Sequence, residues 1–237
     1  MNQINGRPLR KMFWSVSSRY DMLNSFFTLG LDKSWRNKAV EELLQGSPQK
    51  ILDLGTGTGD LAINLSKASS YPLEVVALDF SQPMLDVATM KAKQRNLNGI
   101  RFVLGDSAEI PFNEHYFDKV GTSFAFRNLT HENPDTDLFF KEIIRVLKPG
   151  GDFIAVDTAQ PHNKFVRKLF HLYMNAYAAP IGGLISGKKE AYRYLAKSAT
   201  DFDGLDKMQG RLINFGFKSV EYRPLFGGVA ALWKCLK

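Results

Sequence analysis

Residues 51–60 read Ile51-Leu52-Asp53-Leu54-Gly55-Thr56-Gly57-Thr58-Gly59-Asp60, and this stretch decides the fold. An apolar run that breaks into alternating glycines and then resumes predicts a buried strand, a tight turn and the start of a helix. Glycine lets a backbone approach a ligand closely, because it carries no side chain. The stretch therefore predicts a parallel strand with a ligand-binding turn at its carboxyl end.

A second apolar run, 75–78, ends in Asp79, about 20 residues past Gly59. An acidic side chain at the end of the neighbouring parallel strand can accept hydrogen bonds from both hydroxyls of a ribose. We therefore expect the turn to bind a ligand that contains ribose. A turn that is merely rich in glycine is the alternative, and the strand before it together with Asp79 argues against that alternative.

The last position of the glycine pattern separates the ribose-containing ligands from one another. A dinucleotide fingerprint, G-x-G-x-x-G counted from Gly55, would place its third glycine where this chain has Asp60. A carboxylate there would repel a phosphate. S-adenosylmethionine carries adenosine and a sulfonium in place of phosphates, so we expect S-adenosylmethionine to be the cofactor.

Candidate strands and helices alternate along the chain after a helical N-terminal segment, 1–45. Ser81 followed by Pro83 predicts a helix start, and Lys148-Pro149-Gly150-Gly151 predicts a helix stop. The segment 224–228 is too short for a helical crossover, so the last two strands should be antiparallel. The expected strands are 50–54, 74–79, 100–104, 117–124, 151–157, 218–223 and 229–235. This pattern predicts a Rossmann-like α/β fold of the class I methyltransferase type, a seven-stranded, mostly parallel sheet with an antiparallel last strand and helices on both faces.

Length and composition fit one domain, 1–237, because 237 residues with 44% hydrophobic content can bury a full core. No run approaches the ~18 apolar residues that cross a bilayer, and residues 1–10 contain no apolar segment of signal-peptide length, so we expect a cytoplasmic protein. A single cysteine, Cys235, forms no internal disulfide and is expected to be a buried thiol. The four histidines show no metal-ligand spacing with it, so no metal is expected.

The net charge of +7 favours anionic partners. No basic stripe is interleaved with aromatic residues, so nucleic acid is not expected. The densest basic cluster flanks the apolar stretch 177–185 and consists of Lys164, Arg167, Lys168, Lys188, Lys189 and Arg193. We expect this cluster to dock transiently on an anionic membrane surface, at the inner face of the membrane, with an ordinary solvated basic face as the alternative.

Short motifs that run nearly from end to end of the chain carry a resemblance to a known family. The motifs are Arg19-Tyr20-Asp21-Met22-Leu23-Asn24, Trp35-Arg36, the glycine turn, Ser123-Phe124-Ala125-Phe126-Arg127-Asn128-Leu129, Arg145-Val146-Leu147-Lys148-Pro149-Gly150-Gly151, Tyr192-Arg193-Tyr194-Leu195 and Gly227-Gly228-Val229-Ala230-Ala231-Leu232. The chain resembles the ubiquinone/menaquinone biosynthesis C-methyltransferases. This resemblance implies methyl transfer from S-adenosylmethionine to a ring carbon of a membrane-resident prenylated quinol, with the segment 160–203 as a helical insertion on the acceptor side. The chain departs from the family at Asp32, Asp157 and Trp233, all of them expected near the acceptor.

Chemistry and resemblance together assign the cofactor site. Asp79 should bind the ribose hydroxyls, and Asp106 and Ser107 should contact the adenine, although Asp106 could instead cap a turn. Met84 should pack on the ribose or the adenine, with a plain core role as the alternative. The residues assigned to the cofactor site are Asp53, Gly55, Gly57, Thr58, Asp79, Phe80, Met84, Asp106, Ser107 and Ser123.

Carbon methylation needs an electron-rich ring, and a quinol hydroxyl with a pKa near ~10 must lose its proton or have its oxyanion stabilised. Arg127 and Asn128 follow the fourth strand, at the edge of the sheet where ligands bind, and we assign both to catalysis. Arginine stays protonated, so Arg127 should stabilise the oxyanion or hold a water that carries the proton away. An ion pair between Arg127 and an acid such as Asp157 is the structural alternative.

The acceptor pocket is expected to be lined by Tyr20, Asp157, Tyr192 and Tyr194, although aromatic residues at such spacing are about as often part of a core. Two other functions stay open from the sequence. The chain could methylate another lipophilic or small phenolic acceptor, or it could be a non-catalytic subunit that binds the cofactor as a scaffold. A homodimer also stays open.

Overall fold

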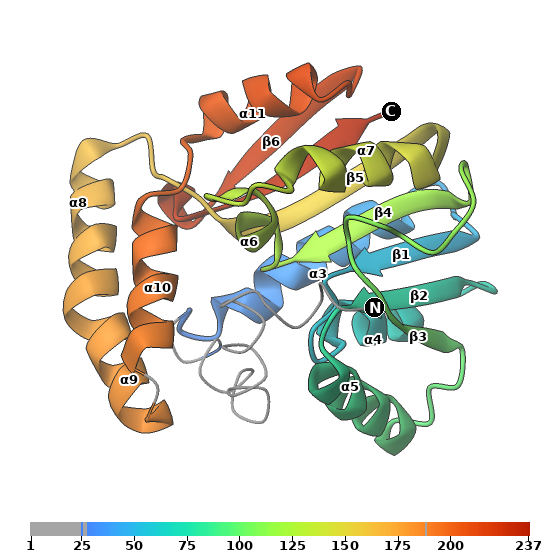
Figure 1. Ribbon diagram of the computed structural model, residues 1–237, viewed down its shortest axis with the longest axis horizontal. Helices are drawn as coiled ribbons and strands as arrows, with labels where there is room; N and C mark the ends of the chain where they lie inside the picture. Colours follow the sequence, from blue (N-terminus) through green and yellow to red (C-terminus); the bar gives the residue numbers. More distant parts are fainter. Residues whose placement is uncertain (1–24, 26–27, 188) are drawn as a thin grey trace.

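The computed structural model describes Ser25, residues 28–187 and residues 189–237. Its centre is a seven-stranded sheet in the order β3-β2-β1-β4-β5-β7-β6 (Figure 1). The strands are β1 (Lys50–Leu54), β2 (Glu74–Asp79), β3 (Ile100–Leu104), β4 (Phe117–Ser123), β5 (Leu147–Thr158), β6 (Ser219–Leu225) and β7 (Ala230–Leu236). β7 runs antiparallel to both of its neighbours, β5 and β6, and the other pairs are parallel. The expected Rossmann-like sheet with a reversed last strand is confirmed.

The first three strands begin and end where the sequence predicted. The main difference from the prediction lies at the start of β5. The helix α7 ends at Val146, as the Lys-Pro-Gly-Gly motif predicted. The motif was expected to lie before the fifth strand, but it forms part of the long strand β5. The pairing of β4 with β5 jumps from Phe117↔Leu147 to Lys119↔Asp152. The motif therefore forms an irregular start of the strand, because residues 148–151 find no regular register beside β4.

Helices cover both faces of the sheet (Figure 1). On one face α3 (Leu31–Leu44) and α4 (Asp60–Ala68) pack through one buried side each. On the other face lie α7 (Thr136–Val146) and α11 (Leu205–Asn214). In α7 the buried side chains Phe139, Phe140, Ile143 and Val146 follow helical spacing, which is why this segment forms an amphipathic helix. Two further helices, α5 (Gln82–Gln94) and the short α6 (Phe126–Thr130), follow β2 and β4 along the chain.

Trp233 lies in the core on the α7 side of the sheet, and this corrects the expectation that it lies near the acceptor. Its side chain is fully buried on β7, and its ring centroid is 5.2 Å from that of Phe126. Cys235, two residues further along β7, is buried as predicted, and burial raises the pKa of its thiol. Alternation along the strand sends both side chains into the same core.

A group of helices stands at the carboxyl edge of the sheet, to the left in Figure 1. The group consists of α8 (Lys164–Tyr173), the π-helical turn η2 (Met174–Ala178), α9 (Ala179–Ser186) and α10 (Lys189–Thr200). We call it the helical insertion, and it falls within the expected segment 160–203. Asn163 begins α8 by accepting hydrogen bonds from the backbone N–H groups of Phe165 and Val166. Among the described residues, no helix is both long enough and apolar enough to cross a bilayer.

Candidate active site

The glycine turn between β1 and α4 has a left-handed backbone at Gly55, Gly57 and Gly59, with φ values of 69°, 55° and 83°. A Cβ at Gly55 would lie 2.8 Å from Cβ of Ala125, so close packing excludes a side chain there. A Cβ at Gly57 would meet no atom within 4 Å. The middle glycine therefore borders open space, which is the arrangement that a backbone cradle for a ligand requires.

Asp79 is fixed beside this turn at the carboxyl end of β2. Its Oδ2 accepts a hydrogen bond from the backbone N–H of Gly57 at 2.8 Å, and its Oδ1 accepts one from that of Ser81 at 2.8 Å. Parallel pairing of Leu54 with Leu78 brings the two strand ends together. The carboxylate is buried and oriented by the backbone before any ligand binds, so its position fits the predicted contact with ribose hydroxyls.

Two buried polar atoms at the ends of β1 and β4 have no hydrogen-bond partner among the described residues. They are Oδ1 of Asp53 and Oγ of Ser123. The other oxygen of Asp53 accepts hydrogen bonds from Oγ1 of Thr56 at 2.5 Å and from the backbone N–H of Ala62 at 3.0 Å. Burial raises the pKa of Asp53 to about 7. A cation beside it would favour the ionised form, and S-adenosylmethionine carries both an ammonium group and a sulfonium, so the site fits this cofactor.

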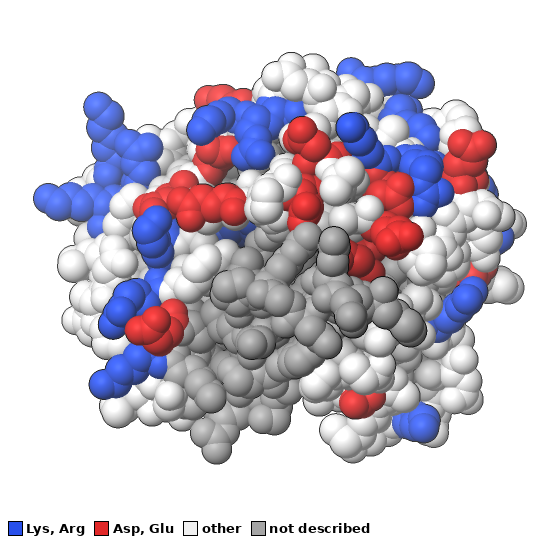
Figure 2. All heavy atoms as spheres, viewed as in Figure 1, with Lys and Arg blue, Asp and Glu red and all other residues white. Residues whose placement is uncertain are grey.

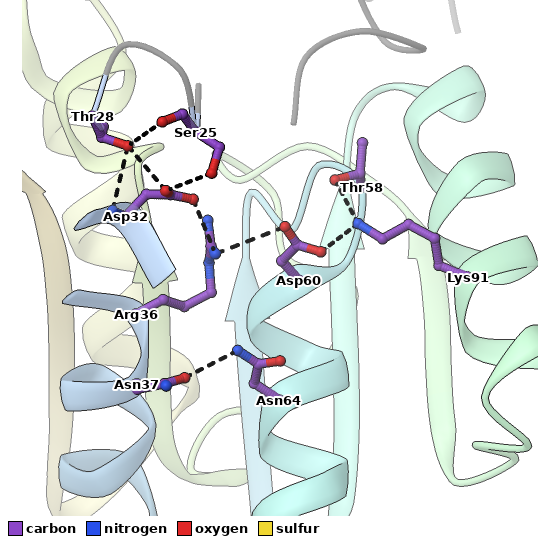
Figure 3. A network of polar contacts seen from close by, with 9 residues as sticks. All are labelled: Ser25, Thr28, Asp32, Arg36, Asn37, Thr58, Asp60, Asn64 and Lys91. Atoms are coloured by element: carbon purple, nitrogen blue, oxygen red, sulfur yellow. Dashed lines mark hydrogen bonds and ion pairs between the residues drawn. The ribbon is translucent and has the colours of Figure 1, made fainter. Parts of the chain in front are cut away.

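Asp60 takes part in ion pairs, which corrects the role that the sequence gave it. The carboxylate pairs with Lys91 of α5, and its Oδ2 lies 3.7 Å from Nη1 of Arg36. Nζ of Lys91 also donates a hydrogen bond to Oγ1 of Thr58 at 3.2 Å. Figure 3 shows Asp60 between the two cations. Asp60 should therefore repel a phosphate less than the sequence predicted, because two cations compensate its charge.

The same network continues to Asp32, one of the positions at which the chain departs from the family. The carboxylate of Asp32 is buried, and its Oδ2 lies 3.5 Å from Nη1 of Arg36. Its Oδ1 accepts hydrogen bonds from the hydroxyls of Ser25 at 3.0 Å and Thr28 at 2.9 Å (Figure 3). The network thus joins the start of α3 to the glycine turn.

The predicted adenine contacts lie at the carboxyl ends of β2 and β3. Oδ1 of Asp106 accepts a hydrogen bond from the backbone N–H of Ala108 at 3.0 Å, so this side chain does cap a turn, as the alternative proposed. Ser107 is buried next to it. Phe80 follows β2 directly, and Met84 is buried on the first turn of α5. All ten predicted cofactor residues lie on the strand ends, turns and helix starts along one edge of the sheet.

A cavity of about 380 Å³ lies next to this edge, between the ends of β4 and β5 and the helical insertion. Its lining is mostly apolar, and Arg127 is the one charged side chain among the lining residues that the structure describes. The lining residues are Thr28, Leu29, Leu31, Trp35, Phe124, Arg127, Thr158, Val166, Leu169, Phe170, Tyr173, Met174, Ala178, Ala179, Tyr192, Leu195, Ala196, Phe226 and Val229. Since Ser123 is assigned to the cofactor site and its neighbour Phe124 lines the cavity, the two sites meet at the end of β4.

Arg127 is buried and held by the end of β5. Its backbone N–H donates a hydrogen bond to Oδ2 of Asp157 at 2.9 Å, and its Nη1 lies 3.6 Å from Oδ1 of the same carboxylate. Nη1 also donates a hydrogen bond to the hydroxyl of Thr158. The Nε–H is buried and has no hydrogen-bond partner among the described residues. The ion pair weighed as an alternative is therefore present, and Arg127 also lines the cavity.

The other predicted acceptor residues divide into three groups. Tyr192 lines the cavity. Tyr194, Asn128 and Asp157 are absent from the described lining. Tyr194 is half-buried, and burial raises its pKa despite the opposing charge of Arg127. Asp157 is fully buried behind Arg127, so it acts on that side chain, and Oδ1 of Asn128 is buried with no partner among the described residues. Tyr20 lies outside the described residues.

Several lining residues were not identified from the sequence. Thr158 directly follows Asp157 at the end of β5, and its place at a strand end was a usable signal. Phe124 was quoted only as part of a motif, yet it is buried with a φ of 60°, a conformation that a bulky residue rarely adopts. Phe170 and Leu169 reach the cavity only because the helical insertion folds over the edge of the sheet, which no local pattern indicates.

The whole chain, residues 1–237, matches the ubiE/COQ5 methyltransferase family. The demethylmenaquinone methyltransferase of Thermus thermophilus is 39% identical over 221 residues, which cover 93% of this chain and 97% of the relative. The protein of the same name from Deinococcus radiodurans is 37% identical over 231 residues, covering 98% and 93%. The one from Staphylococcus carnosus is 36% identical over 231 residues, also covering 98% and 93%.

Solved structures share the fold at low sequence identity. An S-adenosylmethionine-dependent methyltransferase of Thermotoga maritima superimposes with a TM-score of 0.66 at 16% identity, covering 96% of this chain and 99% of that one. Phosphoethanolamine N-methyltransferase 2 of Haemonchus contortus, solved in complex with S-adenosyl-L-methionine, gives a TM-score of 0.59 at 18% identity, covering 85% and 52%. These likenesses support the class I methyltransferase fold.

Proposed function

The chain belongs to the ubiE/COQ5 methyltransferase family and is an S-adenosylmethionine-dependent methyltransferase, and we propose that it methylates a ring carbon of a prenylated quinol in menaquinone biosynthesis. The observation that carries the proposal is the place of Arg127, the one charged side chain among the described lining residues, in a mostly apolar cavity beside the cofactor edge. A quinol with a prenyl tail offers the matching groups, an ionisable oxygen on the ring and a long apolar chain. The relatives named as demethylmenaquinone methyltransferases favour a menaquinone precursor over a ubiquinone precursor.

Arg127 stabilises the ring oxygen while the ring hydroxyl passes its proton to a water molecule. A fixed cation in a cavity of low polarity lowers the free energy of an adjacent oxyanion more than it would in water. The oxyanion in turn makes the ring carbon nucleophilic. Asp157 and Thr158 hold the guanidinium in place, so its charge needs little reorganisation when the oxyanion forms.

The residues of the glycine turn and the adjacent strand ends hold the cofactor. Asp79 binds the ribose, while Asp53 and Ser123 provide buried polar atoms for the charged methionine part. When bound, S-adenosylmethionine supplies an electrophilic methyl group on a sulfonium. The end of β4 orients the reaction, because it contributes Ser123 to the cofactor site and Phe124 to the cavity.

Methyl transfer from labelled S-adenosylmethionine tests this proposal. The purified chain should methylate a reduced demethylmenaquinone, and mass spectrometry should place the methyl group on a ring carbon. Labelling of simple phenols with equal efficiency would favour the broader phenolic alternative. Cofactor binding without transfer to any quinol or phenol would favour the scaffold alternative and contradict the proposal.

A further inference from the structure

We propose that the outer side of α8, together with its basic residues, docks on an anionic lipid bilayer and places the cavity mouth at the membrane surface. This inference rests on the proposed function, because a prenylated acceptor resides in the membrane. It concerns a different part of the chain from the residues that bind the cofactor.

Helix α8 has two apolar sides with different surroundings. Val166, Phe170 and Tyr173 line the cavity, and their spacing of four and three residues places them on one side of the helix. Phe165 and Leu172 lie on the neighbouring side and are 70% and 59% exposed. An apolar side of this kind, left in contact with water, is typical of a helix that lies in a membrane interface.

Leu169 connects the two sides of α8. It lines the cavity and is also half exposed, on the same side as Phe165 and Leu172. Two other lining residues at the mouth are exposed, Leu29 at 75% and Phe226 at 63%. The apolar lining therefore continues from the cavity onto the outer surface, which provides a path for a prenyl chain between a bilayer and the site.

Basic side chains border the exposed apolar side. At 100° per residue, Lys164 and Lys168 lie on the opposite side of α8 from the cavity, next to Phe165 and Leu172, and Arg167 lies on the other flank of the helix. None of the three forms an ion pair with a described residue, so their charges face solvent uncompensated. Arg193 on α10 is partly compensated by Glu190, whose Oε1 lies 3.5 Å from Nη1 of Arg193. Figure 2 shows Lys and Arg side chains along the left margin of the molecule, over the helical insertion.

The charges identify a lipid surface as the partner. An apolar side alone would equally suit a second copy of this chain, but two copies would bring like charges of α8 together. An anionic leaflet attracts each such cation and accepts the exposed apolar side chains between its headgroups. Lys188, which the sequence placed in the same cluster, lies outside the described residues.

Sedimentation with lipid vesicles tests the docking without any acceptor. The full chain should bind vesicles of phosphatidylcholine with phosphatidylglycerol, bind pure phosphatidylcholine weakly, and be released by high salt. Lys164→Glu/Lys168→Glu should lower binding to the anionic vesicles at least about 30-fold, because two attractive charges are replaced by repulsive ones. Phe165→Ser/Leu172→Ser should lower it to a similar degree.

Matched controls use residues far from α8. Lys93→Glu/Lys141→Glu makes the same change of net charge on α5 and α7, and Met90→Ser/Leu138→Ser removes two exposed apolar side chains from the same helices. Both controls should bind vesicles nearly as well as the parent chain. Equal binding to anionic and neutral vesicles, or unchanged binding of the α8 variants, would overturn the proposal. So would a dimer that Phe165→Ser/Leu172→Ser dissociates, since the exposed side of α8 would then be an interface between copies.

Methyl transfer separates this inference from the proposed function. The α8 variants should keep their rate on a water-soluble quinol with a short tail and lose it on a long-tailed quinol held in anionic vesicles. Loss of both activities in the α8 variants, with cofactor binding intact, would assign these residues to the cavity and contradict docking. Normal vesicle binding by a parent chain that methylates no quinol would leave the docking intact and refute the proposed function.

Discussion

Nη1 of Arg36 lies 3.7 Å from Oδ2 of Asp60 and joins α3 to the first turn of α4. The same nitrogen lies 3.5 Å from Oδ2 of Asp32, whose other oxygen accepts a hydrogen bond from Thr28. Because Thr28 lines the cavity and Asp60 follows the glycine turn, one buried guanidinium connects the wall of the acceptor cavity with the cofactor cradle. The position of α3 should therefore affect cofactor binding as well as stability.

Replacement of Arg36 by Met should destabilise the fold and weaken cofactor binding. It leaves the carboxylate of Asp32 buried without its cation, a situation that typically costs about 3–5 kcal/mol. Cofactor affinity should fall by roughly tenfold, because Asp60 and the adjacent turn lose one anchor. Chemical denaturation and calorimetric titration measure the two effects. Arg223→Met, which removes a half-exposed ion pair with Glu42, is the control and should change stability by less than about 1 kcal/mol. Equal effects of the two substitutions would contradict this role of Arg36.

Asp79→Ala should weaken S-adenosylmethionine binding by roughly 10- to 150-fold, or ~1.5–3 kcal/mol. The substitution removes the acceptor for the ribose hydroxyls and leaves the N–H groups of Gly57 and Ser81 without their partner. The fold should survive, because the residue lies at a strand end. Calorimetric titration decides the matter, with Asp86→Ala on the exposed side of α5 as the control. An unchanged dissociation constant would refute the assignment of Asp79 to the ribose.

Cofactor affinity should rise with pH between about 6 and 7.5. Burial raises the pKa of Asp53 to about 7, so the unliganded protein is mostly protonated at this position at the lower pH. A cationic ligand binds more tightly to the ionised form, so its affinity should increase about 5- to 10-fold over this interval as the carboxyl ionises. Titrations at several pH values test this, and Asp53→Asn should flatten the profile. A profile that stays equally steep in Asp53→Asn would assign the effect to another group.

Arg127→Met should lower turnover by ~100-fold or more while cofactor binding stays nearly unchanged. The substitution keeps most of the apolar stem and removes the cation. It also leaves Asp157, which is fully buried, without its ion pair, and so it should destabilise the fold. Arg127→Met/Asp157→Asn removes both charges and should recover stability but not turnover. Recovery of turnover in the double variant would show that Arg127 acts only as a structural partner of Asp157.

The sheet and the cofactor edge could be predicted from the sequence because their signals are local. Buried parallel strands contain long apolar runs, and β1 and β2 coincide with such runs. The glycine pattern and Asp79 lie at the ends of such runs, and parallel strands bring their carboxyl ends to one edge. The Pro/Gly segment 224–228 is likewise too short for a helical crossover, so the reversed direction of β7 also followed from the length of this segment.

The charge network and the acceptor cavity depend on tertiary contacts between distant segments. Asp60 looked like an unpaired acid in the glycine turn, and only the packing of α3 and α5 beside it supplies Arg36 and Lys91. Trp233 was expected near the acceptor because it directly follows a family motif. Its side chain is instead buried in the core, which only the packing of β7 shows.

The sequence by itself thus determined the strand segments, the reversed last strand, the cofactor edge and the choice of Arg127 as the cation at that edge. The tertiary structure decided which side chains line the cavity beside that cation, because α8 and α10 contribute Phe170 and Tyr192 to the same lining as Thr158. The physical reason is that strand periodicity and glycine conformation act between near neighbours in the chain, whereas a cavity forms from surfaces of helices and strands that meet only on folding.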